Sequence, residues 1–278
     1  MTEKKAPDID RPERNISAPV LGVHLLGLDL QRQVRTRKTI FLFVIQLLPA
    51  IIAIFSLVGG SLAGLETFES TVEGVYLPLL LPLAALFFGG PTIVDEVEGR
   101  TITYLTLRPL SRTTLLLSKL ATSMILAIAV TTIPIVLFFV ICMLGSPDGF
   151  GAGLPLLGSA VGTVAVGAIT YTAVFALLGV IFASTLLPGI VYYVVFELIL
   201  AAIPLVEVMS IKFHLFTIGG FERHEPDDEG GMREMLENMI LDQPLDPQWW
   251  VGLLCVGLLT LTAVVASALI FKQRQFHV

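Results

Sequence analysis

Long apolar segments alternate with short polar segments along this chain. A membrane-spanning α-helix needs about 20 consecutive apolar residues to cross about 30 Å of hydrocarbon. By this measure we expect six spans, at approximately residues 39–61, 75–94, 114–144, 153–183, 186–207 and 249–271. The third and fourth exceed the crossing length, so we expect them to tilt or to extend beyond the hydrocarbon. The pattern predicts an all-α membrane protein with six transmembrane helices.

The composition supports a membrane location. Of the 278 residues, 55% are hydrophobic and 14% are charged, and the mean hydropathy is +0.85. These values lie outside the usual range of soluble domains. Residues 1–19 are polar, contain proline and lack the apolar core of a signal peptide, so we expect a disordered cytoplasmic tail there. Residues 39–278 then form a single six-span domain.

A short segment before the first span, residues 20–38, combines apolar and basic positions. Leu21, Leu25 and Leu28 recur at helical spacing. The basic positions that follow are Arg32, Arg35, Arg37 and Lys38. Such a helix suits the headgroup boundary, with its apolar face toward the acyl chains and its bases toward anionic lipid. We predict an interfacial helix that contacts membrane lipids; the alternative is a solvated linker.

The basic residues are divided unequally between the two sides of the membrane. With six spans, the side that holds both tails and the second and fourth connections carries 14 of the 17 lysines and arginines. The other side carries Lys212, Arg223 and Arg233. By the positive-inside rule the richer side, with both termini, is cytoplasmic.

The second connection, residues 95–119, reads DEVEGRTITYLTLRPLSRTTLLLSK. Gly99 can end the preceding helix in a left-handed conformation. A short helix over 101–107 would stop near Arg108, because a residue before proline is disfavoured in helical geometry. Ser111 is then suited to cap the next span. The loop is either a docking element at the membrane surface or an ordinary basic turn.

The same loop carries a resemblance to a known family. The patterns E-x-E-G-R-T, Y-L-x-L-R-P-L-S-R and L-L-L-S-K, placed between the second and third spans, resemble the signature around the coupling helix of type-2 ABC exporter permeases. The matching positions are Glu96, Glu98, Gly99, Thr101, Leu105, Pro109, Ser111, Arg112 and Lys119. Two positions depart from the pattern: Arg100 separates Gly99 from Thr101, and Ser118 stands where glycine is frequent.

The resemblance implies a function and a set of partners. It implies the permease subunit of an ABC exporter in a bacterial-type plasma (inner) membrane, with an interfacial elbow helix at 20–38 and a cytoplasmic coupling helix. The expected partners are an ABC ATPase subunit, which would bind ATP and Mg, and a second permease chain in a homodimer or a heterodimer. No nucleic-acid partner is expected. The residues implied in coupling are Glu96, Glu98, Gly99, Arg100, Thr101, Tyr104, Leu105, Arg108, Pro109 and Arg112.

The chain has no nucleotide-binding signature of its own. The pattern GxxxxGK[ST] is absent, and none of the six lysines follows a glycine, so there is no Walker A phosphate cradle. We also find no HExxH, no paired membrane aspartates and no Ser-His pair within the spans. We therefore expect a non-catalytic subunit without a bound cofactor or metal. A membrane anchor or scaffold that recruits a cytoplasmic partner without transport is the alternative.

Two polar side chains lie deep within predicted spans. Glu197 is about 11 residues into the fifth span, which is about 16 Å at a rise of 1.5 Å per residue. An unpaired charge at such depth costs about 3 kcal/mol or more. Either Glu197 and Gln46 face a translocation path, or Glu197 is protonated and hydrogen-bonded to a neighbour such as Gln46 or Thr172.

Small residues occur at four-residue spacing in two runs along the fourth span. They are Gly158 and Gly162, and then Ala168, Thr172 and Ala176. Such spacing permits close helix contact in membranes. We expect packing within one subunit, with a substrate path as the alternative.

The outer loop, residues 208–248, is acidic and contains a methionine-bearing amphipathic segment, GMREMLENMI. We expect that segment to pack on the outer ends of the spans or to lie at the lipid surface. Binding of a soft metal such as Cu(I) is the alternative. Cys142 and Cys255 fall in apolar spans without CxxC spacing and are expected to act as small hydrophobic residues.

Overall fold

The computed structural model describes residues 18–58, 64–90, 112–144, 149–182, 184–199, 203, 206–221 and 248–273. Within these ranges the chain forms helices and turns and contains no strand, which confirms the all-α class. The predicted coupling residues from Glu96 to Pro109, the acidic outer segment 222–247 with its methionine-bearing helix, and the tail up to residue 17 lie outside the described residues.

Within the described ranges, five helical segments are long and apolar enough to cross a membrane. They are Arg37–Phe55, Leu65–Gly89, Leu116–Leu144, Phe150–Phe182 and Trp249–Lys272. The first comprises α2 (Arg37–Gln46) and the start of α3 (Leu48–Val58), and the second comprises α4 (Leu65–Thr71), η1 (Val72–Leu80) and α5 (Leu81–Gly89). The others lie in α8 (Arg112–Leu144), α9 (Gly149–Phe182) and α13 (Trp249–Gln273).

The fifth predicted span, residues 186–207, has a shorter described helix than expected. It consists of α10 (Leu186–Tyr192) and the π-helical η2 (Tyr193–Ile199), and a turn of 3-10 helix, η4 (Glu207–Met209), comes after it. Fourteen helical residues extend about 21 Å, less than the hydrocarbon thickness of about 30 Å. A complete crossing by residues 186–207 therefore remains a prediction.

The second span begins ten residues earlier than predicted. The helix starts at Leu65 and not near residue 75. The predicted start was too late because Glu66, Glu69 and Glu73 interrupt the apolar run in the sequence, although they do not end the helix. Phe68 and Val72 lie on the inner face and are fully buried. Helical periodicity, and not continuous apolarity, thus sets this boundary.

The helix before the first span, α1 (Ala18–Val34), bends into α2 at a hydrogen-bonded turn. The carbonyl of Gln33 accepts hydrogen bonds from Thr36 Oγ1 at 2.7 Å and from Thr39 Oγ1 at 2.6 Å. These two hydroxyls satisfy a carbonyl at the end of α1, where the helix supplies no donor. The predicted elbow segment is therefore a helix followed by a fixed bend, and its location at a membrane interface remains a prediction.

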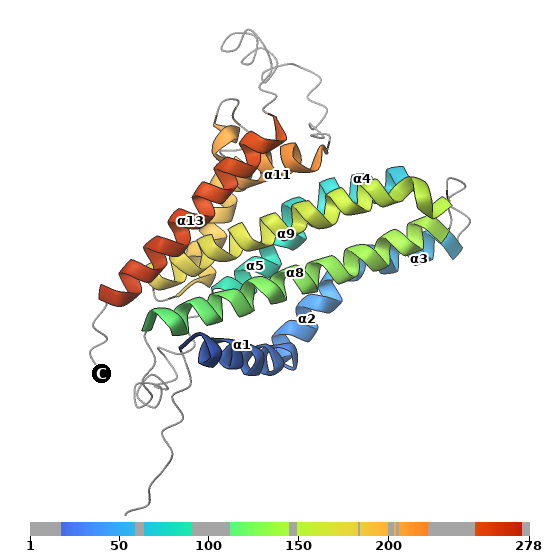
Figure 1. Ribbon diagram of the computed structural model, residues 1–278. Coiled ribbons are helices and arrows are strands. Elements are labelled where there is room, and N and C mark those ends of the chain that lie inside the picture. The colour runs from blue at the N-terminus through green and yellow to red at the C-terminus, as the bar shows by residue number, and fades with distance from the viewer. Residues whose placement is uncertain are drawn as a thin grey trace, which may run out of the picture.

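The helices α8 and α9 run antiparallel and side by side, and α5 packs against both (Figure 1). Figure 1 also shows α1 beside α8, and α13 crossing over α9 next to α11 (Ile211–Gly219). In this view α8 begins, and α9 and α13 end, at the same end of the molecule. This arrangement agrees with the predicted sharing of one membrane side by the second connection, the fourth connection and the C-terminus.

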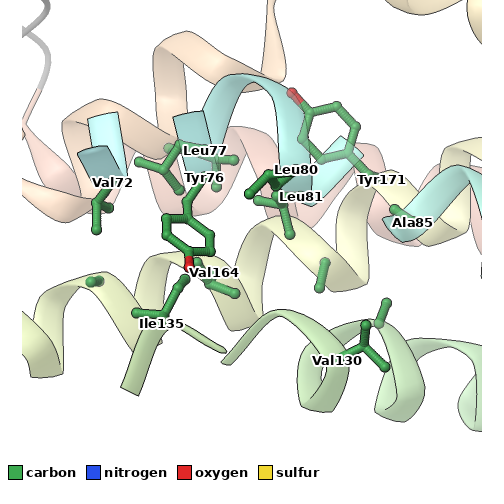
Figure 2. Close-up of a cluster of buried hydrophobic side chains, with 14 of the residues drawn as sticks. Val72, Tyr76, Leu77, Leu80, Leu81, Ala85, Val130, Ile135, Val164 and Tyr171 are labelled. Carbon is green, nitrogen blue, oxygen red and sulfur yellow. The ribbon is translucent and has the colours of Figure 1, made fainter. Parts of the chain in front are cut away.

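The core fills the space between the second span and the pair α8–α9. In Figure 2 the side chains of Val72, Tyr76 and Leu81 face Ile135 of α8 and Val164 of α9. Phe68 adds aromatic contacts with Phe138 and Phe139, at ring-centroid distances of 5.7 Å and 5.2 Å. This packing fixes the second span against the two longest helices.

Two π-helical segments, η1 and η2, are tied to each other. Pro82 has no N–H group, so the carbonyl of Pro78 lacks the donor that an α-helix would supply four residues later. The hydroxyl of Tyr193, in η2, donates a hydrogen bond to this carbonyl. The irregular middle of the second span is therefore satisfied by a side chain from the α10–η2 segment.

Candidate functional site

The strongest polar site among the described residues surrounds Glu197 in η2. Its side chain is 2% exposed. One carboxylate oxygen, Oε1, accepts a hydrogen bond from the N–H of Ile211 at 3.0 Å. The other, Oε2, accepts from the N–H of Lys212 at 3.1 Å and from Ser210 Oγ at 3.1 Å. The carboxylate thus has three donors inside one subunit.

These donors belong to the beginning of α11. Ser210 is the N-cap residue, and its Oγ accepts a hydrogen bond from the N–H of Phe213 at 3.2 Å. The first four N–H groups of a helix have no partner within it, and here Glu197 satisfies two of them and Ser210 a third. Negative charge is also favoured at this end by the helix dipole. Glu197 therefore forms part of the N-terminal cap of α11.

The other end of α11 is fixed as well. Gly220 follows the helix with φ of +65°, a left-handed conformation that glycine adopts without a steric penalty. The N–H of Phe221 donates to the carbonyl of Phe216 at 3.1 Å, which closes the last turn. The hydroxyl of Ser159, in α9, donates to the carbonyl of Gly219. Hence α11 is held between η2 and α9.

Two buried polar atoms near this region lack a hydrogen-bond partner within the described ranges: the hydroxyl of Tyr171 and Nδ1 of His214. Tyr171 stacks on Phe175 of the same helix, with ring centroids 6.1 Å apart. His214 lies on α11, outside the long spans. Burial lowers the pKa of its imidazole, against a smaller opposing contribution from a hydrogen bond with the Val208 backbone. His214 is therefore neutral at pH 7.

The second predicted path residue, Gln46, belongs to a separate hydrogen-bond network. Its Nε2 donates to the carbonyl of Leu80 at 2.8 Å and to Thr131 Oγ1 at 3.3 Å. Its backbone carbonyl accepts from the hydroxyl of Tyr76 at 3.1 Å. Gln46 is completely buried and links α2 to the second span and to α8. The suggestion that Gln46 or Thr172 would be the partner of Glu197 was wrong, because α11 supplies the partners.

The small residues of the fourth span divide into two groups. Ala168 and Ala176 are buried, and Thr172 lies against α5, where a Cβ added to Gly89 would come within 2.7 Å of the Thr172 carbonyl oxygen. A Cβ added to Gly158 or Gly162 would meet no described atom within 4 Å. The prediction of close packing within the subunit was correct for the first group and wrong for the two glycines.

The ten predicted coupling residues lie in and directly after the loop between α5 and α8. Nine of them, from Glu96 to Pro109, lie outside the described residues, and Arg112 begins α8 without a described side chain. The loop is bracketed by Gly90 at the end of α5 and by Arg112. Their role in coupling stays a prediction.

Sequence reasoning missed the hydrogen-bonding roles of Ser210 and Tyr193. A serine followed directly by the apolar helix IKFHLFTIG is a recognisable N-cap signal, so Ser210 could have been found. Tyr193 gave no such signal, because its partner Pro78 lies 115 residues away in the sequence. Among the described residues no group of three or more His, Cys, Asp or Glu could hold a metal ion.

Comparison with known proteins places these features in a wider context. A family model described as "ABC-2 family transporter protein" matches residues 33–214. The matched range begins in the last turn of α1, includes the loop at 95–119, and ends within α11, so it contains both Gln46 and Glu197. A search of curated proteins finds no match to the chain.

Proposed function

The chain belongs to the ABC-2 transporter family, and from this premise we propose that it is the transmembrane permease subunit of an ATP-driven exporter. The match over residues 33–214 carries the proposal, because it covers four of the five long helices together with the loop at 95–119. The exposed apolar side chains on α2, α3 and α13 agree with helices that face lipid.

In this proposal the ATPase is a separate chain. It binds ATP and Mg, and the residues from Glu96 to Arg112 dock on its surface. Charges of both signs in this loop, such as Glu98 and Arg108, complement groups on the partner. Closure of the ATPase then moves the loop and the spans attached to it as rigid bodies.

The assembly contains two permease chains in a bacterial-type plasma (inner) membrane, with both termini in the cytoplasm. The positive-inside distribution of lysine and arginine supports this orientation. Gln46 and Glu197 would contribute to the translocation path only after rearrangement, since their hydrogen bonds now lie within one subunit.

The test is an affinity purification of the tagged chain from its native membranes in mild detergent, with mass spectrometry of the proteins recovered. We expect a P-loop ATPase to accompany the wild type and to be lost in Arg108→Glu. Lys272→Glu is the matched control, because it reverses an exposed charge on the same predicted side, at the end of α13. An ATPase that stays bound to Arg108→Glu would contradict the coupling role of the loop.

A second measurement separates transport from scaffolding. The recovered complex is reconstituted in lipid, and distances between spin labels on the spans are compared without nucleotide and with trapped ATP. A permease changes these distances on nucleotide binding. A chain that binds the ATPase and shows no change would support the scaffold.

A further inference from the structure

The last turn of α5 is joined to the turn between α9 and α10 by one hydrogen bond. Thr185 Oγ1 donates to the carbonyl oxygen of Gly90 at 2.9 Å. Both residues are buried, and Thr185 is 6% exposed. Helix α5 ends at Gly89 and Gly90 is its C-cap residue, so Thr185 donates to a carbonyl at the C-terminal end of α5.

Close contacts among glycines surround this bond. A Cβ added to Gly90 would lie 2.6 Å from Thr185 Cβ. A Cβ added to Gly179, in α9, would lie 2.6 Å from Thr185 Oγ1 and 2.9 Å from the Gly90 carbonyl oxygen. These atoms are backbone or the root of a β-branched side chain, so they cannot move aside independently. We call the set of Gly90, Gly179 and Thr185 the Thr185 clasp.

The clasp lies between the two segments that a coupling movement must connect. Gly90 directly precedes residues 91–111, which contain nine of the ten predicted coupling residues. Thr185 is the N-cap residue of α10, and its carbonyl accepts from the N–H of Gly189 at 2.8 Å. The α10–η2 segment in turn carries Tyr193, bonded to the second span, and Glu197, bonded to α11.

The neighbouring contacts make this junction stiff. A Cβ on Gly89 would come within 2.7 Å of the Thr172 carbonyl oxygen, and one on Gly189 within 2.3 Å of Leu86 Cδ1. The end of α5 is thus enclosed by α9 on one side and by the start of α10 on the other. Mechanical coupling between sites passes through packed contacts of this kind.

We propose that the Thr185 clasp transmits displacement of the coupling loop to the α10–η2 segment, and that Thr185 is a positioning residue for ATP-driven coupling. This inference rests on the proposed permease function. Covalent continuity alone would connect the loop to α5 and α8. The clasp adds a third connection, to the α10–η2 segment. Glu197 in that segment then connects it to α11.

The test uses the complete complex of permease and ATPase reconstituted in lipid. Thr185→Val keeps the shape of the side chain and removes the donor, whereas Thr185→Ser keeps the donor. Gly179→Ala introduces a methyl group that forces Thr185 away from Gly90. Gly158→Ala is its matched control in the same helix, since its new Cβ meets no described atom within 4 Å. Spin labels at Leu198 and Leu258, both exposed, report movement of η2 relative to α13, with Cys255 replaced by alanine.

We expect all four variants to recover the ATPase and to hydrolyse ATP. The nucleotide-dependent change in the label distance should persist in Thr185→Ser and Gly158→Ala. It should fall about two-fold or more in Thr185→Val and Gly179→Ala.

Three results would overturn the proposal. A change of wild-type size in both Thr185→Val and Gly179→Ala would remove the clasp from the coupling path while leaving the permease function intact. Loss of ATPase recovery in Thr185→Val would assign Thr185 to folding. A wild-type chain that never recovers an ATPase would overturn the permease function itself, and the clasp with it.

Discussion

Ser210 Oγ donates a hydrogen bond to Glu197 Oε2 at 3.1 Å and accepts one from the N–H of Phe213 at 3.2 Å. One hydroxyl therefore joins the cap of α11 to a carboxylate in η2. Since Glu197 also accepts from the N–H groups of Ile211 and Lys212, the beginning of α11 depends on a residue from another helix. This relationship couples the stability of α11 to that of the α10–η2 segment.

Replacement of Glu197 should destabilise the protein more than replacement of an exposed glutamate. Glu197→Ala leaves the N–H groups of Ile211 and Lys212 without their acceptor, and an unsatisfied buried donor costs about 1–3 kcal/mol. Glu197→Gln keeps one oxygen but turns an NH₂ group toward the helix N-terminus, so we expect an intermediate loss. The measurement is the unfolding midpoint in detergent, followed by tryptophan fluorescence. The matched control is Glu66→Gln, because Glu66 on α4 is exposed. Equal midpoints for Glu66→Gln and Glu197→Gln would contradict this role.

The effects of Ser210 and Glu197 should not add. Ser210→Ala removes the cap of α11 and should cost about 1 kcal/mol. In the double variant with Glu197→Ala, the hydrogen bond between the two side chains is lost only once, so the total should be smaller than the sum by about 0.5 kcal/mol or more. A double-mutant cycle of unfolding free energies measures this term. Strict additivity would mean that the two groups act independently.

The sequence predicts the bounds of the long helices better than the contacts between helices. Runs of apolar residues identify α8, α9 and α13 within a few residues, because the length needed to cross a membrane is a strong signal. The start of the second span was missed, because Glu66 interrupts the apolar run while the buried face of the helix continues through Phe68.

At the candidate site, too, the sequence does not predict which helices come into contact. The depth of Glu197 indicated that its side chain must face protein or a cavity, and the structure places it against the beginning of α11. Its partners could not be derived, because the approach of α11 to η2 depends on tertiary packing and not on local spacing. For the residues from Glu96 to Arg112 the sequence is informative, because their pattern resembles a known signature. Their contacts stay a prediction.

Tyr193→Phe should destabilise the junction between η2 and the second span. The variant removes the donor to the Pro78 carbonyl and keeps the ring. A buried hydrogen bond of this type contributes about 1 kcal/mol. Tyr192→Phe is the control, since Tyr192 packs through its ring against Phe175 and Phe196. The unfolding midpoints of the two variants provide the comparison, and a larger loss in Tyr192→Phe would contradict the assignment.

Gln46→Met should lower the stability of the bundle at a position where the shape of the side chain is preserved. The variant removes the donor to Leu80 and Thr131, two groups that then lose a partner in an apolar environment. We expect a loss of about 1–2 kcal/mol in unfolding free energy. The hydrogen bond from Tyr76 to the Gln46 carbonyl is retained, because it involves the backbone. An unchanged midpoint would show that the network contributes little, and would favour a role for Gln46 in the path.

Acidification should destabilise α11 through His214. Burial lowers the pKa of this imidazole below its ordinary value of 6.5. The unfolded chain therefore binds a proton at His214 at a higher pH than the folded chain does. Stability that depends on neutral His214 is complete above pH 6.5 and is lost as the pH falls below it. We expect the unfolding midpoint to decrease between pH 7.5 and 5.5, and to decrease less in His214→Gln. The other three histidines are common to both proteins, so the difference between the two slopes belongs to His214. Parallel slopes would show that the imidazole titrates alike in both states.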